Sequence, residues 1–430
     1  MAYKLFKMCP RIESVVSAGL CTGCGTCVGI CPEECIEINT KNPVPFYDGI
    51  KCKDCGLCYD VCPGCSVDFP AINKQLFGTD EIEPLGIFKE AYIGYSTDPE
   101  IRKNSSSGGI VTALLLYALE NKLVNGAIVV GENKEEPWLA EPIVAKSKKE
   151  VIDAMQSKYT IVPVNSILKQ IKSEKSKFAF VGLPCHVHGL RIAANVNAKI
   201  IEKIDFIVGI YCGLSSTLGA TEFTLRKLGI KNFAEIKKME YRGGEWPGGF
   251  KVTLKNGETK FIDKFRHNYI ISLFLPDRNK ICIDFANDFA DISVGDAWIP
   301  ELISERKGWS IVLVRTEKGE KILREAEKEG YIKLKKITKE EAFAAHKHMI
   351  AYKKKRCWAR MRVFRALRRE VPDYGFNKKV TKKELLHELL FLFATWIASK
   401  EIVRKIISFI PISIMGGIVV LIRKHITKRR

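Results

Sequence analysis

The chain has 430 residues, a formal net charge of +20, 46% hydrophobic residues and 15 cysteines. This length predicts two or three domains, and the hydrophobic fraction is sufficient for buried cores, which excludes a disordered chain and a small secreted scaffold. The first residues lack the apolar stretch of a secretory signal, and eleven cysteines clustered near the N-terminus are an odd number for a disulfide framework. We therefore expect a reducing cytosol and a metal-binding module.

The basic charge is concentrated at the C-terminal end. Residues 351–430 contain 21 Lys and Arg against 5 Asp and Glu, so that the rest of the chain is almost neutral. A basic, apolar end beside a neutral body favours an anionic membrane surface or an acidic partner over nucleic acid.

Residues 1–78 are predicted to form a two-cluster, ferredoxin-like domain. Two stretches carry the spacing C-x2-C-x2-C-x3-C-P, which is typical of bacterial ferredoxins, and the fourth cysteine of each run ligates the other cluster there. The expected ligands are Cys21, Cys24, Cys27 and Cys62 for one 4Fe–4S cluster, and Cys52, Cys55, Cys58 and Cys31 for the second. A pair of zinc sites is the alternative. The remaining cysteines here, Cys9, Cys35 and Cys65, are expected to be free thiols.

Residues 79–350 are predicted to form an α/β domain. Short apolar runs at 91–96, 126–131, 178–184 and 205–213 are expected to be strands, and the patterns at 110–121 and 186–195 are expected to be helices. Strands separated by helices and broken by glycine indicate a mostly parallel sheet that is covered on both faces.

Three junctions in this domain contain residues that suggest a binding site. The small residues Ser105, Ser106, Ser107, Gly108 and Gly109 directly precede the helix predicted at 110–121. A helix N-terminus of this kind binds phosphate groups, although serines in this position are also ordinary helix caps. Both interpretations remain open at this point.

The second junction follows the strand at 178–182 and contains Pro184, Cys185 and His186. Ligands in open α/β sheets bind at the carboxyl ends of parallel strands. A thiol at a helix start can be activated by a lowered pKa, whereas a single cysteine is more often a packed small side chain.

The third junction combines the short strand 292–295, which leads into Asp296, with the glycine-rich stretch 241–250. That stretch contains Arg242 and Trp246, and it is expected either to cover a planar ring or to form a simple hairpin.

The end of the chain, residues 351–430, is predicted to be a basic, helical tail with two apolar segments, Leu385 to Ser399 and Ile406 to Ile422. A helix of 17 residues spans about 25 Å, which is at the low limit for crossing a bilayer, and Pro411 interrupts it. We expect an anchor that lies in the interface or re-enters it, with packing against the core or a partner as the alternative.

Six motifs in order resemble the coenzyme F420 hydrogenase/dehydrogenase beta-subunit family. They are SSSGGIVTALLLYALE, QSKY, VGLPCHVHGLR, GIYCG, YRGGEWPGG and CIDFANDFADISVGDAW, and together with the ferredoxin module they cover about two thirds of the chain. The sequence departs from the family pattern at Asn279, because members often read C-x2-C-x-D where only Cys282 and Asp284 match here. The use of this pair by an additional cluster is left open.

The resemblance implies a flavoprotein with FAD in the central domain, which exchanges a hydride with coenzyme F420 and electrons with iron–sulfur clusters. The implied catalytic residues near the flavin ring are Cys185 and His186. The implied cofactor-binding residues are Ser105, Ser106, Ser107, Gly108, Gly109, Lys158, Tyr159, Pro184, Arg242 and Asp296.

The sequence thus predicts an oxidoreductase on the cytoplasmic face of a membrane that passes electrons between reduced coenzyme F420 and a membrane-linked acceptor or partner subunit. The first alternative is a ferredoxin-dependent FAD reductase of an unsaturated organic substrate from a lipid or polysaccharide pathway. The second alternative is an electron-transfer subunit without a substrate of its own.

Overall fold

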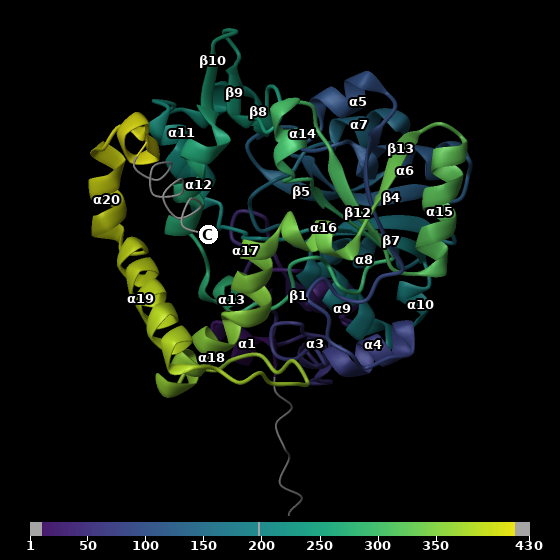
Figure 1. Ribbon diagram of the computed structural model, residues 1–430. Coiled ribbons are helices and arrows are strands. Elements are labelled where there is room, and N and C mark those ends of the chain that lie inside the picture. Colours follow the sequence, from purple (N-terminus) through teal and green to yellow (C-terminus); the bar gives the residue numbers. More distant parts are fainter. Residues whose placement is uncertain (1–10, 197, 418–430) are drawn as a thin grey trace, which may run out of the picture.

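The structure is a computed structural model that describes residues 11–196 and 198–417. Cys9 and the end of the second apolar segment, residues 418–422, lie outside the described residues. The chain forms an N-terminal cysteine-rich module, a large sheet with helices on both faces, a small three-stranded sheet and a helical C-terminal segment (Figure 1).

The N-terminal module is built from short elements around the two cysteine runs. They are α1 (Ile12–Ser17), α2 (Thr26–Ile30), β1 (Ile36–Glu37), β2 (Phe46–Tyr47), α3 (Leu57–Asp60) and α4 (Phe69–Phe77), with β1 and β2 antiparallel. The two runs begin their helices in the same way, because Gly25 and Gly56 precede α2 and α3 with φ of 82° and 75°. Only glycine adopts this left-handed conformation without strain, and here it turns the chain between successive cysteines.

The large sheet has eight strands. In spatial order they are β13 (Ile332–Ile337), β3 (Glu90–Ser96), β12 (Ser310–Val314), β11 (Ile292–Asp296), β7 (Ile204–Ile210), β6 (Phe178–Gly182), β4 (Gly126–Glu132) and β5 (Ala140–Ala145). The strands predicted at 91–96, 126–131, 178–184 and 205–213 are therefore confirmed as β3, β4, β6 and β7.

The prediction of a mostly parallel sheet is wrong. Only the neighbours β11, β7, β6 and β4 run parallel to one another, and the other four pairings are antiparallel. Parallel neighbours need a crossover of a dozen or more residues, usually a helix on the sheet face. The link from β4 to β5 has seven residues and no helix, so that β5 runs antiparallel beside β4.

Helices cover both faces of the sheet. One face carries α5 (Pro99–Asn104), α6 (Ile110–Glu120), α7 (Lys148–Asp153) and α15 (Glu317–Lys328), and its core contains Ala179 and Val208. The other face packs on α8 (Leu168–Ile171), α9 (Pro184–Ala194), α10 (Ala198–Ile201) and α16 (Lys339–Ala344), with a 3-10 turn at Val164–Ile167. The helices predicted at 110–121 and 186–195 are confirmed as α6 and α9.

The small sheet is an excursion of the chain between β7 and β11. It contains the antiparallel strands β8 (Ile236–Gly243), β9 (Gly249–Leu254) and β10 (Thr259–Asp263), flanked by α11 (Gly219–Lys227), α12 (Lys264–Leu273) and α13 (Asp277–Lys280). The glycine-rich stretch 241–250 is the turn between β8 and β9, which confirms the hairpin interpretation. A short helix, α14 (Pro300–Ser304), separates β11 from β12.

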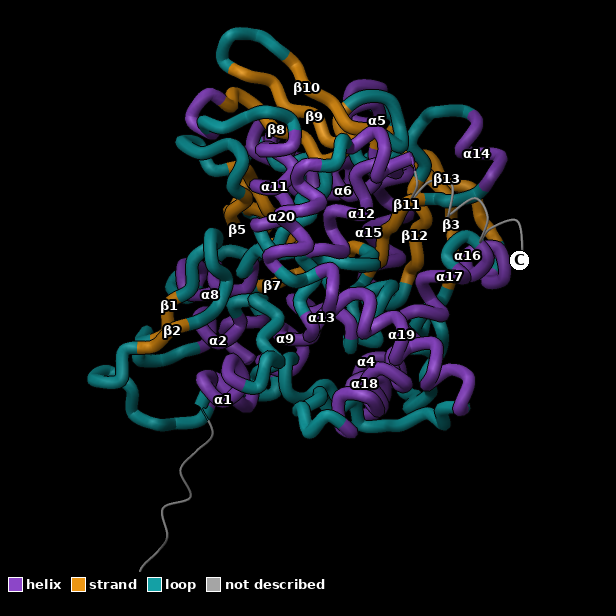
Figure 2. Tube along the Cα trace, turned by 90° about the vertical axis from the view of Figure 1, so that its left-hand side faces the viewer, coloured by secondary structure: helices purple, strands orange, loops and turns teal. Residues whose placement is uncertain are grey.

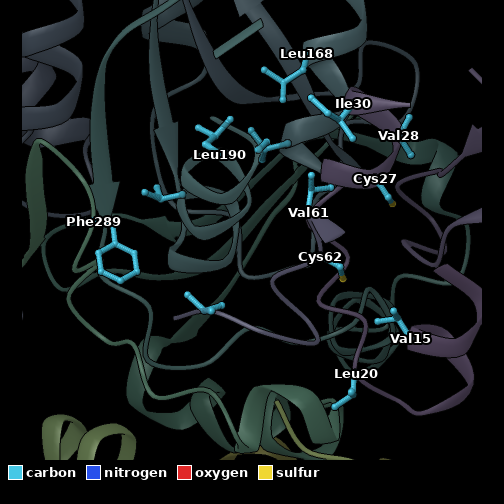
Figure 3. Packing of buried hydrophobic residues seen from close by; sticks show 14 of the residues in the cluster. Val15, Leu20, Cys27, Val28, Ile30, Val61, Cys62, Leu168, Leu190 and Phe289 are labelled. Carbon is cyan, nitrogen blue, oxygen red and sulfur yellow. The ribbon is translucent and has the colours of Figure 1, made fainter. Parts of the chain in front are cut away.

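The module and the large sheet share one hydrophobic core. Figure 3 shows Cys27, Ile30 and Val61 of the module near Leu190 of α9 and Leu168 of α8. All five side chains are at most 6% exposed. The side chain of Asn165 strengthens this contact, because its Nδ2 donates to Thr26 Oγ1 in α2 and to the His186 carbonyl in α9, each at 2.8 Å. The module is therefore packed onto the central domain rather than tethered to it.

The C-terminal segment is divided into a buried and an exposed part. It comprises α17 (Lys347–Ile350), a π-helix (Ala351–Lys355), α18 (Cys357–Ala366), α19 (Lys382–Ala398) and α20 (Glu401–Phe409). Cys357, Trp358 and Met361 of α18 are buried in the shared core, and Ser66 of the module forms a parallel bridge with Asp373. Figure 2, turned by 90° from the first view, shows α18 next to α19, against which it packs.

The exposed part consists of α19 and α20, which run along one edge of the molecule (Figure 1). Lys227 of α11 donates to the carbonyls of Ile407 and Ile410 and so caps the end of α20. The second apolar segment is interrupted at this point, since α20 ends at Phe409, just before Pro411. Within the described part of the chain, no helix meets the length and hydropathy that a membrane span requires.

Candidate redox site

The centre of the candidate site is the guanidinium group of Arg242, at the end of β8. Its Nη1 and Nη2 donate to the two carboxylate oxygens of Asp296 at 3.1 and 3.2 Å, a bidentate arrangement. Nη1 also donates to the Tyr159 hydroxyl at 3.0 Å, Nη2 donates to the Ser106 carbonyl at 2.7 Å, and Nε donates to the Pro247 carbonyl at 2.6 Å. The structure thus brings together four predicted site residues from four distant parts of the chain.

The charges of this pair are fixed by its surroundings. Burial by itself raises the pKa of Asp296, but the nearby cations of Arg242 and Lys264 outweigh it and lower that pKa to about 2. Lys264 Nζ lies 3.7 Å from the carboxylate. The pKa of Arg242 is raised, because the attraction of Asp296 and Tyr159 outweighs the desolvation of the guanidinium. Both groups are therefore ionised throughout the physiological pH range.

Aromatic rings lie beside this ion pair. Trp246 donates its indole N–H to Asp296 Oδ1 at 3.3 Å and stacks on Trp298, with ring centroids 5.0 Å apart. The ammonium of Lys264 lies 4.2 Å from the centroid of Trp298. Trp246 and Trp298 each stand in a motif of the sequence, whereas Lys264 stands in none, because its only signal is proximity in space.

A further residue that the sequence did not indicate is His346, which precedes α17. Its Nε2 hydrogen-bonds to the backbone carbonyl of Asp296 at 2.8 Å, and its ring packs edge-on against Tyr211. Burial lowers the pKa of His346 to about 4, so that the ring is neutral and Nε2–H is the donor. His346 therefore links the C-terminal part of the chain to the backbone of Asp296.

The serine-rich loop lies against the same arginine. All three hydroxyl groups are used within the protein: Ser105 donates to the Ile101 carbonyl, Ser106 accepts from the Ser157 amide, and Ser107 shares a hydrogen bond with Ser310. The amino end of α6 has no side-chain cap, and Gly109 precedes it with φ of 80°. An anion at this loop would therefore be bound by the backbone N–H groups of the first turn of α6 and by the dipole of that helix.

Lys158 does not face this loop as a free cation. Its ammonium donates to the carbonyls of Ala154, Met155 and Gln156, which follow α7. Burial lowers the pKa of Lys158 to about 8, against the opposing attraction of Glu132. The side chain therefore fixes the end of α7 and the QSKY segment, and it positions Tyr159 indirectly.

His186 holds the turn between β6 and α9. Its Nδ1 accepts a hydrogen bond from the Leu183 amide at 3.0 Å, and its Nε2 donates to the Val162 carbonyl at 3.0 Å. Burial lowers the pKa of His186 to about 4. Because both ring nitrogens are bound to the backbone and the ring is neutral, the side chain has no free nitrogen for the catalytic role that the resemblance implies. Pro184 is the first residue of α9, where a missing N–H costs nothing.

The two cysteine runs gather around two separate hollows. One is lined by Cys21, Cys24, Cys27 and Cys62, and the other by Cys31, Cys52, Cys55 and Cys58. These are the two sets that the ferredoxin spacing predicts, with the fourth cysteine of each run exchanged between the hollows. Among the described residues, no three His, Cys, Asp or Glu side chains surround a point that a single metal ion would occupy.

The extra cysteines lie next to these sets. Cys35 lines the second hollow, and its Sγ is 3.5 Å from that of Cys31. Cys65 hydrogen-bonds to Cys62, and this interaction lowers the pKa of Cys65. Both are free cysteines, as predicted, but only Cys35 is buried and Cys65 is half-buried. Both side chains contact expected cluster ligands.

Cys185, expected beside the flavin ring, is the second residue of α9, the helix that packs against α2 of the module. Burial raises the pKa of its thiol.

The fold and the cysteine-rich module define an iron–sulfur oxidoreductase, and comparisons with known proteins agree. Models for the N-terminal and C-terminal parts of the coenzyme F420 hydrogenase/dehydrogenase beta subunit match residues 91–169 and 175–340, and a 4Fe–4S binding domain matches residues 14–37. The chain belongs to the coenzyme F420 hydrogenase/dehydrogenase beta-subunit family.

Individual relatives support this assignment. The chain is 34% identical over 259 residues to the coenzyme F420 hydrogenase subunit beta of Methanothermobacter thermautotrophicus, which covers 59% of this chain and 86% of that one. It is 30% identical over 329 residues to one subunit of the F420H2 dehydrogenase of Methanosarcina mazei, covering 73% and 84%. A coenzyme F420-dependent sulfite reductase of Methanocaldococcus jannaschii is 28% identical over 355 residues, covering 77% of this chain and 51% of that one.

A solved structure shares the fold. A chain of the F420-reducing NiFe hydrogenase complex from Methanosarcina barkeri superimposes with a TM-score of 0.53 at 26% identity, covering 66% of this chain and 96% of that one.

Proposed function

We propose that this protein binds FAD at the Arg242 site and transfers electrons between reduced coenzyme F420 and two 4Fe–4S clusters in the N-terminal module. The observation that carries the proposal is the hydrogen bonding of the first cysteine run to the domain that contains the Arg242 site. The third residue of α9 is His186, whose carbonyl accepts from Asn165, and the amide of Asn165 donates to the Cys24 carbonyl at 2.9 Å. The first cysteine run is thereby fixed to the domain that contains Arg242.

The residues at the Arg242 site fit a flavin dinucleotide. A bound flavin accepts a hydride and releases single electrons, which is the conversion that a coenzyme F420 oxidase with iron–sulfur clusters requires. The uncapped start of α6 supplies N–H groups for a phosphate. Arg242 holds this loop through the Ser106 carbonyl, and the stacked rings of Trp246 and Trp298 lie beside it, where an aromatic surface suits a planar ring.

The residues of the module fit two clusters in the same manner. Each hollow is lined by four thiols of the two runs, joined in the second hollow by Cys35, and thiolates are the ligands of 4Fe–4S clusters. Electrons that leave the central domain meet the set containing Cys24 first, because this run packs on α9 through Asn165.

The flavin assignment is tested by the cofactor content of anaerobically purified protein. We expect about one FAD and, from the module, about eight irons per chain. Arg242→Gln removes the bidentate ion pair with Asp296 and the hydrogen bond to the Ser106 carbonyl. The variant should therefore lose its flavin and keep its iron. Arg306→Gln is the matched control, because Arg306 is 77% exposed in its ion pair with Glu245. Retention of FAD by Arg242→Gln would show that the flavin binds at another site.

We also propose that the chain acts with partner subunits, as the names of its relatives indicate for them. The relative named as a sulfite reductase supports a second candidate, in which the same electrons reduce a substrate within one polypeptide. Turnover of an acceptor such as sulfite by the isolated chain would favour this second candidate.

We propose further that α19 and α20 bind an anionic membrane surface on the cytoplasmic face. The exposed side chains Leu386, Leu389, Leu390, Phe393, Trp396 and Ile397 recur at intervals of three and four residues, so that they share one face of α19. Exposed Ile402, Ile406 and Phe409 continue this apolar surface on α20. Lys382, Lys383 and Lys405 are exposed on the same two helices and Lys400 is exposed between them. Such a basic rim suits anionic headgroups.

Cosedimentation with vesicles tests the membrane proposal. The protein should bind vesicles that contain phosphatidylserine more strongly than purely zwitterionic ones. The double variant Phe393→Ser with Trp396→Ser should lose this binding, whereas Leu367→Ser, at an equally exposed leucine at the end of α18, should not. Equal binding by both variants would show that the apolar face of α19 is not the contact.

A further inference from the structure

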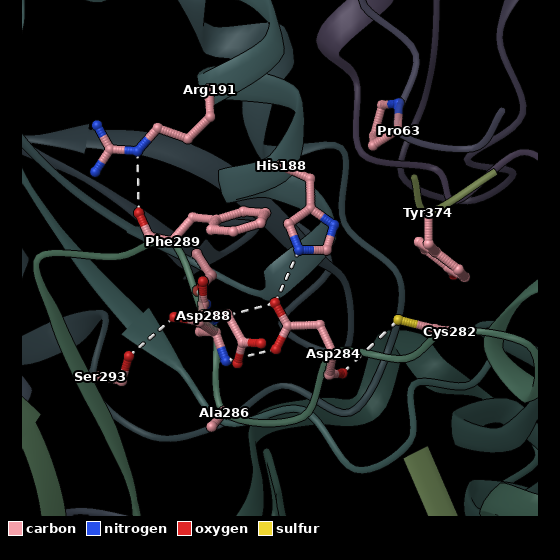
Figure 4. Close-up of polar contacts among 12 residues, drawn as sticks. Pro63, His188, Arg191, Cys282, Asp284, Ala286, Asp288, Phe289, Ser293 and Tyr374 are labelled. Atoms are coloured by element: carbon pink, nitrogen blue, oxygen red, sulfur yellow. Dashed lines mark hydrogen bonds and ion pairs between the residues drawn. The ribbon is translucent and has the colours of Figure 1, made fainter. Parts of the chain in front are cut away.

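Arg278 is a buried cation that joins the cysteine-rich module to the central domain. It lies in α13, and 4% of its surface is exposed. Its Nη2 donates to the Pro63 carbonyl at 2.9 Å, its Nε donates to the Gly64 carbonyl at 3.3 Å, and its Nη1 donates to the Tyr374 hydroxyl at 3.2 Å. Figure 4 shows Pro63 close to Tyr374. Arg278 therefore holds the segment that directly follows Cys62, an expected cluster ligand.

The three acceptors of Arg278 are all neutral. The carboxylate of the preceding residue, Asp277, is bound elsewhere, to Lys280 at 2.7 Å and to Arg369 at 2.8 Å. No carboxylate among residues 11–196 and 198–417 forms an ion pair with Arg278. A guanidinium keeps its proton in proteins, and a buried cation without a counter-ion is costly unless an anion lies near it. This arrangement favours an anionic group near Arg278.

The first cysteine set supplies such an anion when it binds a cluster. We use this name for the lining of one hollow by Cys21, Cys24, Cys27 and Cys62. A 4Fe–4S cluster with four thiolates carries a net negative charge. Burial raises the pKa of Cys21 to about 12, and the charge of Arg278 acts in the opposite direction. Arg278 therefore stabilises negative charge at this set.

Arg278 also acts on the first cysteine set through two peptide groups. The Pro63 carbonyl and the Gly64 amide belong to one peptide group, and the Gly64 carbonyl and the Cys65 amide belong to the next. A Cβ added at Gly64 would lie 3.2 Å from Cys62 Sγ, so that this backbone lies against the ligand sulfur. The Cys65 amide donates to the Cys62 carbonyl at 3.2 Å.

The two amides favour a negative charge on the Cys62 sulfur. The hydrogen bond with the Cys65 thiol and burial raise the pKa of Cys62, and the backbone amides of Gly64 and Cys65 act in the opposite direction. A donor at the carbonyl of a peptide group polarises it and strengthens the hydrogen bond that its N–H donates. Arg278 donates to both carbonyls and so strengthens both amide donors.

The second hollow has no comparable cation. The two basic side chains that line it are Arg11 and Lys53. Arg11 pairs with Asp54 at 2.5 Å, and Lys53 pairs with Glu33 at 2.8 Å. All four side chains are at least 31% exposed, and exposed, paired charges are screened by water and salt. Arg278 therefore distinguishes the first cysteine set from the second.

We propose that Arg278 is a positioning residue that raises the reduction potential of the cluster held by the first cysteine set. This inference rests on the proposed function, because it requires a cluster in the module. Reduction adds one electron, which comes from the reduced flavin, to an anionic and buried cluster. A nearby cation and N–H donors to a ligand sulfur stabilise the added negative charge. Arg278 thereby favours electron transfer to the set that packs on the central domain.

An EPR-monitored redox titration of the anaerobically purified full-length protein tests this role. The wild type should show one transition for each of the two clusters. Arg278→Gln removes the charge and keeps an N–H donor. The reduction equilibrium of one cluster should shift about tenfold towards the oxidised form, which corresponds to about 59 mV for one electron. The transition of the other cluster should stay unchanged.

Two further variants separate the charge of Arg278 from its structural role. Arg278→Lys keeps the positive charge and should shift neither transition. Arg369→Gln is the matched control, because it removes an equal charge from a side chain that is 38% exposed and paired with Asp277. This variant should also leave both transitions unchanged, since an exposed charge is screened.

Unchanged transitions in Arg278→Gln, or an equal shift of both, would overturn the proposal. If Arg278→Gln loses about four irons, Arg278→Lys decides the question. Wild-type iron content and transitions in Arg278→Lys would support a role of the charge. Loss of iron in both variants would overturn that role, because Arg278 would then only hold the segment after Cys62.

These outcomes are distinct from a failure of the proposed function. Dithionite and redox mediators reduce the clusters directly, so the titration does not depend on bound FAD or on coenzyme F420. The iron content of the wild type reports the clusters themselves. About four irons or fewer in the wild type would contradict the two clusters of the proposed function rather than the role of Arg278.

Discussion

At the scale of single residues, the sequence allowed the charged centre of the site to be predicted, but not its neighbours. Arg242 and Asp296 stand in recognisable motifs, and the structure joins them by a bidentate ion pair. Lys264 and His346 contact the same aspartate from segments with no motif. Their roles depend on which loops the fold places together, and no local pattern records that.

His186 shows the opposite error. Its position after a parallel strand suggested chemistry, but the structure binds both ring nitrogens to the backbone. A histidine at the third position of a helix can cap the preceding turn, and this structural use has the same sequence signal as a catalytic one.

Buried neutral histidines make the protein sensitive to mild acid. Burial lowers the pKa of His267 to about 4, and its Nε2–H donates to Thr224 Oγ1. Below about pH 6.5, the histidine of the unfolded chain takes up a proton, whereas that of the native chain stays neutral. The contribution of His267 to the free energy of unfolding is therefore fully present above pH 6.5 and decreases as the pH falls towards 4. We expect this residue alone to lower the free energy of unfolding by about 2 kcal/mol between pH 7.5 and pH 5.

Denaturant unfolding of His267→Phe at these two pH values tests the prediction. The variant keeps the stacking on Phe250 and should show a pH dependence smaller by about 2 kcal/mol than that of the wild type. Tyr269→Phe on the same helix is the control and should leave the pH dependence unchanged. The same pH dependence in His267→Phe and the wild type would mean that His267 is not neutral in the native protein.

At the scale of elements, the amphipathic and apolar patterns predicted the strands β3, β4, β6 and β7 and the helices α6 and α9, but not the direction of the outer strands. Direction is decided by the length and packing of the connections. The sequence pattern of a buried strand such as β12 is the same in either direction, since all five of its residues are buried.

The contact between α2 and α9 allows no additional atoms. A Cβ added at Gly189 would lie 2.1 Å from Thr26 Oγ1 and 3.0 Å from Asn165 Nδ2. We expect Gly189→Ala to destabilise the protein by about 1 to 3 kcal/mol through overpacking and to displace the first cysteine run from the central domain.

Stopped-flow reduction of the clusters through the flavin measures this displacement. Gly189→Ala should slow cluster reduction and leave flavin reduction unchanged. Gly49→Ala, where the nearest atom is 3.7 Å away, should affect neither rate. Unaltered cluster reduction in Gly189→Ala would contradict an electron path across this contact.

At the scale of the whole molecule, the division of the C-terminal segment was not predictable from composition. Basic residues are frequent throughout residues 351–430, yet α18 is a core helix whose Arg360 is fully buried. This arginine forms an ion pair with Glu388 of α19, and its Nη2 donates to the Tyr352 carbonyl. The charge of Arg360 thus serves internal pairing, whereas the exposed lysines of α19 and α20 remain available to a surface.

The pair between Arg360 and Glu388 fastens α19 to the protein. Glu388→Gln leaves a buried guanidinium unpaired, and breaking such a pair costs about 3 to 5 kcal/mol. We expect faster proteolysis within residues 381–409 in this variant. Glu401→Gln, at an exposed position on α20, is the control, and equal cleavage of the two variants would show that the buried pair does not hold the helix.

The central claim is that a flavin in the α/β domain connects coenzyme F420 with iron–sulfur clusters in the same chain. The most direct test is an anaerobic optical titration of the purified protein with reduced coenzyme F420, which follows the flavin and cluster absorption in one spectrum. The account predicts that both bands bleach together. If neither band responds while dithionite or reduced ferredoxin bleaches both, coenzyme F420 is not the electron donor and the account is contradicted.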